Sequence, residues 1–177
     1  DAARMPAAIK GVMLSCILSD TLECRSPTTT NQDQALAEIL AIDLGLSIPN
    51  YSAEMFAAKS DISEFSDTEL LRMDSKEYAI QGFKFRVSVL ETTSPKTVLD
   101  RKASLMATMP SVAAEDGVDH VLLFVVDILN QQAIMLIPDA ISKSVAEKSF
   151  GAIVTRDIVI LPGIMSRKKQ IIPYLKV

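Results

Sequence analysis

The stretch LPGIMSRKKQIIPYL, residues 161–175, sets three consecutive cations, Arg167, Lys168 and Lys169, between two apolar runs. Ser166 is a good N-cap, so the cations are expected in the first turn of a short helix. The helix dipole already places partial positive charge and free N–H groups there, so the cations destabilise that turn unless an anion faces them. Such a cluster suits a phosphate group. The side chains could equally extend into solvent as a charged collar, and the sequence leaves both interpretations open.

Asp20, in the motif LSDTL, presents the opposite problem. It follows an apolar helical run, and the carboxyl end of a helix carries partial negative charge. A metal ion would satisfy it, and carboxylates are hard ligands that suit Mn²⁺ or Mg²⁺. Alternatively, Asp20 caps the next turn through Thr21 or the hydroxyls of SPTTT, residues 26–30. Together, Asp20 and the cation cluster suggest a site for a metal-bound phosphate.

Lys76, in RMDSKEYAI, is a third candidate. It lies between an expected helix and an expected strand, soon after a linker, where a cleft between domains could open. The alternative is an exposed lysine paired with Asp74 or Glu77. His120 is the single histidine, and we expect it to be a structural residue at the start of a strand. The eight methionines lie in apolar segments, and we interpret them as core residues.

The composition restricts the class of protein. The chain has 177 residues, 49% of them hydrophobic, which is enough for a substantial core. Its net charge of −4 argues against a nucleic-acid or anionic-membrane binder. Cys16 and Cys24 form no metal-type pair, and we expect reduced thiols and a cytoplasmic protein. We also expect no membrane span and no leader, and the start DAARMP indicates a piece of something longer.

The elements that must position these residues follow from periodicity. The first part predicts helices over residues 7–18 and from the cap Thr30, with Asp33, to Gly45. A polar helical segment with a linker near residues 60–65 follows, and Ser66 with Glu69 forms a second capping box. Beyond it we expect strands at FKFRVSVLE, HVLLFVVDIL, AIMLIP and DIVILPG, with helices starting at Pro95 and covering residues 140–149. This order predicts an α/β domain with a mixed sheet flanked by helices.

Several of these motifs occur in the same order in a known family. LSDTL, SPTTTNQD, DSKEY and LPGIMSRKKQIIP resemble the manganese-dependent, family II inorganic pyrophosphatases of the DHH/DHHA2 phosphoesterase superfamily. The last motif is typical of their carboxy-terminal DHHA2 domain. The resemblance implies that residues 1–62 are the helical end of a DHH domain and residues 63–177 a DHHA2 substrate-binding domain.

The resemblance also implies roles for individual residues. Asp20 would bridge two Mn²⁺ or Co²⁺ ions, and Lys76, Arg167 and Lys168 would bind pyrophosphate, which arrives with Mg²⁺. A metal-bridging hydroxide would attack one phosphorus in line, in the cleft between the two domains, while the cations neutralise charge on the phosphates. Gln170 and Lys169 belong to the motif without an expected substrate contact.

The sequence departs from the family in lacking its amino-terminal half, which carries the His and Asp ligands. We therefore expect the chain to be a carboxy-terminal part that needs the missing DHH domain, has little activity alone, and forms a homodimer when complete. Two alternatives remain: another DHH-superfamily phosphohydrolase, acting on polyphosphate ends or a phosphodiester, and a non-catalytic phosphate-binding module.

Overall fold

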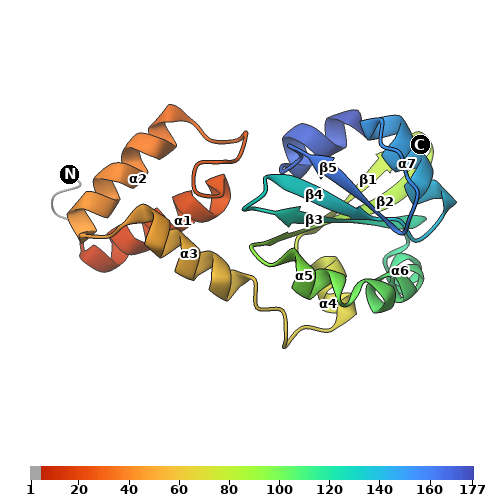
Figure 1. Cartoon of the computed structure of the whole chain (residues 1–177), viewed down its shortest axis with the longest axis horizontal. Helices are drawn as coiled ribbons and strands as arrows, with labels where there is room; N and C mark the ends of the chain where they lie inside the picture. Colours follow the sequence, from red (N-terminus) through yellow and green to blue (C-terminus); the bar gives the residue numbers. More distant parts are fainter. Residues whose placement is uncertain (1–4) are drawn as a thin grey trace. The chain divides into compact units, whose positions relative to one another are not determined.

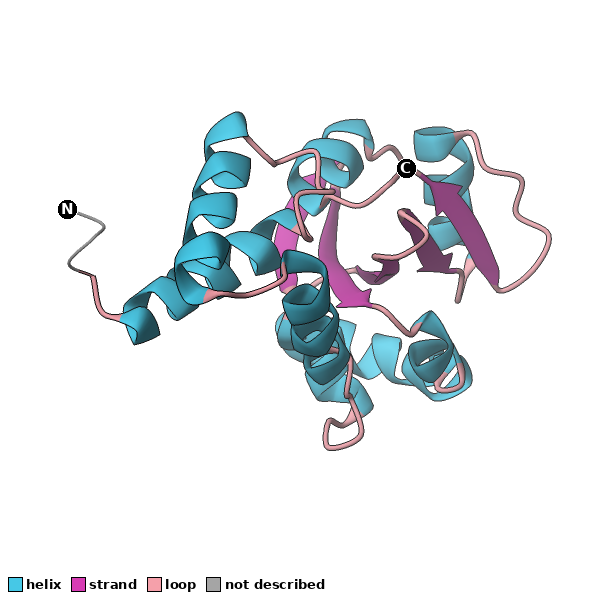
Figure 2. Ribbon diagram, turned by 60° about the vertical axis from the view of Figure 1, so that its left-hand side comes forward, coloured by secondary structure: helices cyan, strands magenta, loops and turns pink. Residues whose placement is uncertain are grey.

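The computed structural model describes residues 5–177, which divide into two units after Lys59. The first unit is helical and the second contains a sheet, as the colouring of Figure 2 shows. Among the described residues, no helix is long and apolar enough to cross a membrane.

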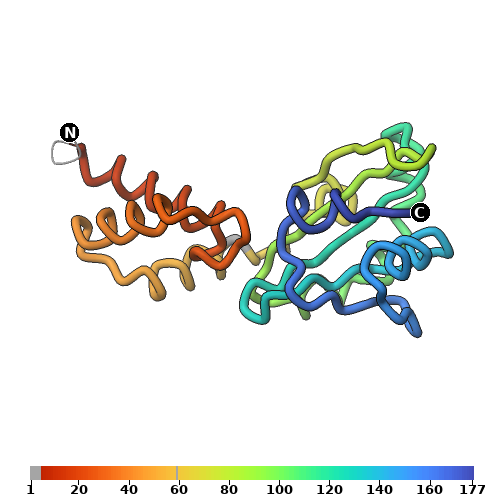
Figure 3. Tube along the Cα trace, turned by 90° about the horizontal axis from the view of Figure 1, so that it is seen from above, coloured from red at the N-terminus to blue at the C-terminus, as the bar shows by residue number. Residues whose placement is uncertain are grey.

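Three helices form the first unit: α1 (Ala7–Thr21), α2 (Asn31–Leu44) and α3 (Ile48–Lys59). They pack side by side in Figures 1 and 3. Their small core consists of Leu14, Leu18, Ala37, Leu40 and Ala41. The predicted capping box is present, since Thr30 accepts a hydrogen bond from the Asp33 N–H and Asp33 accepts one from the Thr30 N–H. Gly45, at φ +65°, ends α2 as expected.

The second unit contains four helices and five strands before its carboxy-terminal turns. These are α4 (Asp67–Met73), β1 (Ser75–Ile80), β2 (Phe83–Thr92), α5 (Pro95–Leu99), α6 (Lys102–Asp116), β3 (His120–Asp127), β4 (Gln132–Leu136), α7 (Ala140–Phe150) and β5 (Ile158–Pro162). A π-helical turn, η2 (Arg167–Ile171), and a 3₁₀ turn, η3 (Ile172–Tyr174), follow. The capping box of Ser66 and Glu69 starts α4, as predicted.

The sheet is mixed, as expected, with the order β1-β2-β3-β4-β5. Strands β2 and β3 pair in parallel, the other three neighbouring pairs are antiparallel, and α5 and α6 form the connection between β2 and β3. In Figure 1, α4, α5 and α6 lie on one face of the sheet, and α7 and the blue carboxy-terminal segment lie on the other. The rings of Phe124 on β3 and Phe150 on α7 meet edge to face at 6.0 Å, which fixes α7 on its face.

Three elements differ from their predictions. Helix α1 does not stop at the polar residues after Leu18 but continues to Thr21, whose hydroxyl donates to the Ile17 carbonyl. The helix expected from Pro95 is two helices, separated by a turn at residues 100–101. Lys76 lies within strand β1 and not between a helix and a strand.

Candidate functional site

The cation cluster is built on a short turn that one glutamine side chain organises. Ser166 accepts a hydrogen bond from the Lys169 N–H at 3.3 Å, so it is the N-cap that the sequence predicts. The side-chain oxygen of Gln170 accepts from the Met165 and Ser166 N–H groups, and its nitrogen donates to the Gly163 carbonyl at 2.7 Å. The loop of residues 163–166 is therefore held in one conformation by hydrogen bonds to the side chain of Gln170.

Arg167 does not extend into solvent. Its two terminal nitrogens donate to the backbone carbonyl and the carboxylate of Asp74, both at 2.7 Å, and its side chain is only 14% exposed. Asp74 lies between α4 and β1, immediately before the segment that carries Lys76. The fold thus brings the η2 turn to the start of β1, 93 residues away in the chain.

Lys76 and Lys168 are both exposed. Within residues 5–177, neither side chain has an ion pair or a hydrogen bond to another described residue. The two proposed partners of Lys76 are engaged elsewhere, because Asp74 binds Arg167 and Glu77 binds Arg86. The interpretation of Lys76 as one half of a surface ion pair is therefore wrong.

This region carries an excess of positive charge. Arg167, Lys168 and Lys76 supply three cations, and among residues 5–177 Asp74 supplies the one carboxylate that forms an ion pair with any of them. Asp74 is 54% exposed, so its pair with Arg167 is a surface ion pair of modest strength. A phosphate group with several oxygens could accept from the Arg167 fork and attract both lysines.

Asp20 is an exposed residue in the last turn of α1. Among the described residues, its carboxylate accepts no hydrogen bond and forms no ion pair. The following turn is closed by Thr21, whose hydroxyl accepts from the Cys24 N–H at 3.1 Å. The predicted alternative, in which Asp20 caps that turn, is therefore not what the structure shows.

An unusual backbone conformation follows Asp20. Leu22, Glu23 and Cys24 have φ values of 51°, 57° and 61°, so three consecutive non-glycine residues are left-handed. Each such residue costs about 1–2 kcal/mol relative to the right-handed form. Backbone N–H groups of Leu22 and Glu23 offset part of this cost by donating to the Leu18 carbonyl.

The described residues contain no cluster of three His, Cys, Asp or Glu side chains that could hold a metal ion. Asp20 offers a single carboxylate, and within residues 5–177 no two further side chains of this kind join it to complete a three-ligand site. His120 stacks on Phe85 at 5.7 Å, and its Nδ1 lies 3.5 Å from Asp139. These are the contacts of a packed residue at a strand end.

The contact of Asp74 with Arg167 and the largely shielded contacts of Arg86 were not predicted from the sequence. Asp74 was visible in the DSKEY motif, but its partner Arg167 is distant in the chain. Arg86 stands in an alternating strand pattern, where an arginine is usually an exposed residue. In the structure its side chain is 13% exposed and contacts both neighbours of Lys76.

Comparisons with known proteins agree on one group of relatives. The model of the DHHA2 domain family matches residues 53–177. The chain is 42% identical over 170 residues to the "Probable manganese-dependent inorganic pyrophosphatase" of Deinococcus radiodurans, covering 93% of this chain and 54% of that protein. It is 37% identical over 169 residues to the manganese-dependent inorganic pyrophosphatase of Bacillus subtilis, covering 94% and 54% respectively.

A solved structure is similar as well. The crystal structure of a candidate family II inorganic pyrophosphatase from Methanococcus jannaschii superimposes with a TM-score of 0.82 at 30% identity. The match covers 96% of this chain and 55% of that one. The chain thus spans about half the length of the relatives it matches.

Proposed function

Because this chain belongs to the DHHA2 domain family, we propose that it is the carboxy-terminal part of a manganese-dependent inorganic pyrophosphatase. The reaction is hydrolysis of pyrophosphate, in which a water oxygen bonds to one phosphorus and the bridging P–O bond breaks to give two phosphates. The proposed domains are residues 1–62, the end of a DHH domain, and residues 63–177, the DHHA2 domain. The family match, the names of the relatives and the cation cluster support this proposal.

The observation that carries the proposal is which partners the three cations have in the structure. Arg167 is already oriented by Asp74, while Lys76 and Lys168 have no partner among the described residues. In our proposal the Arg167 fork binds two oxygens of one phosphate, and the two lysines act as point charges on the remaining oxygens. Their charge stabilises the phosphate that leaves when the P–O bond breaks.

The metal site of the proposal is only partly contained in this chain. Asp20 offers a carboxylate of the kind that Mn²⁺ prefers, and Co²⁺ would use the same ligand. Such ions would supply an activated water and a counter-charge. The described residues contain no group of three such ligands, and in our proposal an amino-terminal DHH domain supplies the remaining ones. Mg²⁺ would enter with pyrophosphate, and the complete protein is proposed to be a cytoplasmic homodimer.

The first test measures pyrophosphate binding by this chain. We would titrate it by calorimetry, with and without Mn²⁺, beside the double variant Arg167→Ala, Lys168→Ala. Each charge-assisted hydrogen bond is worth about 1.5–3 kcal/mol, so the double variant should bind at least about a hundredfold more weakly. A control, Lys96→Ala with Lys143→Ala, removes the same charge from two exposed i,i+4 pairs and should bind normally. Equal weakening in both double variants would show nonspecific charge attraction.

The second test measures turnover. The chain alone should hydrolyse pyrophosphate poorly, because Asp20 is the one metal ligand that the proposal finds among residues 5–177, and adding the separately produced amino-terminal half of the Bacillus subtilis relative should restore hydrolysis. Fast hydrolysis by the chain alone would contradict the proposal. Preference for longer polyphosphates by the restored enzyme would favour another phosphohydrolase.

A further inference from the structure

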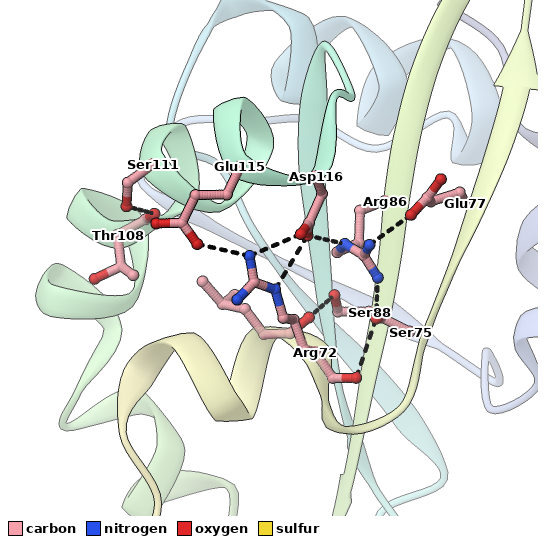
Figure 4. A network of polar contacts seen from close by, with 10 residues as sticks. Arg72, Ser75, Glu77, Arg86, Ser88, Thr108, Ser111, Glu115 and Asp116 are labelled. Atoms are coloured by element: carbon pink, nitrogen blue, oxygen red, sulfur yellow. Dashed lines mark hydrogen bonds and ion pairs between the residues drawn. The ribbon is translucent and has the colours of Figure 1, made fainter.

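A network of ion pairs lies under strand β1, on the face that α4 and α6 cover (Figure 4). We call it the Arg86 network, and its members are Arg72, Ser75, Glu77, Arg86 and Asp116. Asp116, at the end of α6, lies between the two arginines: Arg72 donates to it at 2.7 Å, and the Arg86 Nε lies 2.6 Å away. Arg86 and Asp116 are 13% and 14% exposed, so this pair is largely shielded from water.

Arg86 binds the residues on both sides of Lys76. One terminal nitrogen donates to the Ser75 hydroxyl at 2.7 Å, and the other donates to the Glu77 carboxylate at 2.6 Å. Arg86 pairs with Glu77 across the β1–β2 ladder, so these contacts need no distortion of the sheet. Since side chains alternate along a strand, Lys76 leaves β1 on the opposite face from Ser75 and Glu77.

Strand β1 needs such an anchor because it is an edge strand. It pairs with β2, and in the second unit no strand lies on its other side. An edge residue is held by one ladder of backbone hydrogen bonds, and few buried contacts resist its local opening. Tying Ser75 and Glu77 to a shielded arginine therefore restricts the backbone on either side of Lys76.

We propose that Arg86 is a positioning residue for Lys76, and through it for pyrophosphate binding. The inference rests on the proposed function, since it requires Lys76 to contact the substrate. Arg86 itself lies on the other face of the sheet and does not touch pyrophosphate. Its three nitrogens reach Ser75, Glu77 and Asp116 at once, which the single ammonium of a lysine cannot do.

The structure supplies a matched control in Arg72. Arg72 binds Asp116, as Arg86 does, and also Glu115, but its side chain contacts neither Ser75 nor Glu77. Arg72→Met and Arg86→Met remove the same charge from the same network, and only the second releases the residues beside Lys76. A loss of pyrophosphate affinity that follows only from weakening the Arg86 network should therefore appear in both variants.

The experiment measures pyrophosphate affinity of the full 177-residue chain by calorimetry in a double-mutant cycle. Arg86→Met and Lys76→Ala should each weaken binding about tenfold, the usual scale for loss of a supporting contact. Arg72→Met should change affinity by less than about twofold. Arg86→Met should have no further effect when Lys76→Ala is already present, because Arg86 acts through Lys76. Circular dichroism and thermal unfolding identify variants that fail to fold. If Arg86→Met fails to fold, the measurement uses Arg86→Lys instead.

The outcomes separate this inference from the proposed function. If Lys76→Ala weakens binding and Arg86→Met behaves like Arg72→Met, Arg86 has a structural role only and the inference is overturned. Additive losses in the double variant overturn it too, since Arg86 would then act without Lys76. If Lys76→Ala leaves binding unchanged, or the unsubstituted chain does not bind pyrophosphate, the proposed role of Lys76 fails and the inference fails with it.

Discussion

Two arginines of the second unit form ion pairs of different kinds. In the pair of Arg167 with Asp74 the carboxylate is 54% exposed, so an anion bound at the proposed site could replace it at low cost. The pair of Arg86 with Asp116 is largely shielded, and removing one partner leaves a poorly solvated charge. The first arrangement suits a residue that must exchange partners, and the second suits a residue that must stay in place.

The shielded pair predicts a pH dependence. Hydrogen bonds from Arg72 hold the pKa of the Asp116 carboxyl below its usual value, with Arg86 adding to this effect against the cost of burial. A carboxyl with a depressed pKa in the folded state adds stability above its unfolded pKa and loses it as the pH falls through the folded value. Below about pH 4, the free energy of unfolding should therefore fall less steeply in Asp116→Asn than in the unsubstituted chain. Denaturant titrations at several pH values would measure this, and parallel curves would contradict it.

The loop before the η2 turn is held by the side chain of Gln170. Gln170→Leu removes three hydrogen bonds that hold residues 163–166, and it should weaken pyrophosphate binding and destabilise the chain by about 1–3 kcal/mol. Gln170→Glu keeps the acceptor for two N–H groups and loses the donor to Gly163, so its effect should be smaller. Calorimetry and denaturant unfolding would test whether Gln170→Leu has the larger effect on binding and stability. Equal effects of the two variants would show that the hydrogen bond to Gly163 alone matters.

Elements with local signals were predicted correctly. Both capping boxes, Thr30 with Asp33 and Ser66 with Glu69, join residues three positions apart, so the sequence alone contains them. Strand β1 was missed because SKEYAI lies at an edge and has little apolar alternation. The break between α5 and α6 was missed because Arg101, at the break, contacts Asp67, a residue that periodicity cannot connect to it.

The residues of the candidate site likewise fall into those that a local sequence signal revealed and those whose contacts only the folded chain shows. The cation cluster and Asp20 stood out because their charges conflict with the helix dipole, which is a local property. The contact of Arg167 with Asp74 joins segments far apart in the chain, and only the folded structure shows it. The metal roles implied by the family resemblance stay predictions.

At the scale of the whole molecule, the two units have cores of unequal size. Among the described residues, a cluster of five buried residues lies in the first unit, and a cluster of fifteen lies on the α6 face of the second. Because a small core stabilises less, helices α1, α2 and α3 should open more easily than the central strand β3.

Hydrogen exchange would test this difference. Leu40→Ala and Leu123→Ala each remove a buried leucine and should cost about 2–5 kcal/mol, the first in the helical unit and the second in the sheet unit. Each should reduce amide protection mainly within its own unit, and the helical unit should be less protected in the unsubstituted chain. Uniform loss across all helices and strands in both variants would show that the chain unfolds as one cooperative body.

The edge position of β1 has another consequence, for association between molecules. An open strand edge can pair with the edge of another chain, and charged residues on the strand oppose such pairing. Lys76 and Glu77 are adjacent charges on β1, and at the other edge of the sheet Pro162 gives β5 a position without an N–H donor. The lysine proposed to bind substrate thus also discourages aggregation, so selection for solubility and selection for catalysis would favour the same residue at this position.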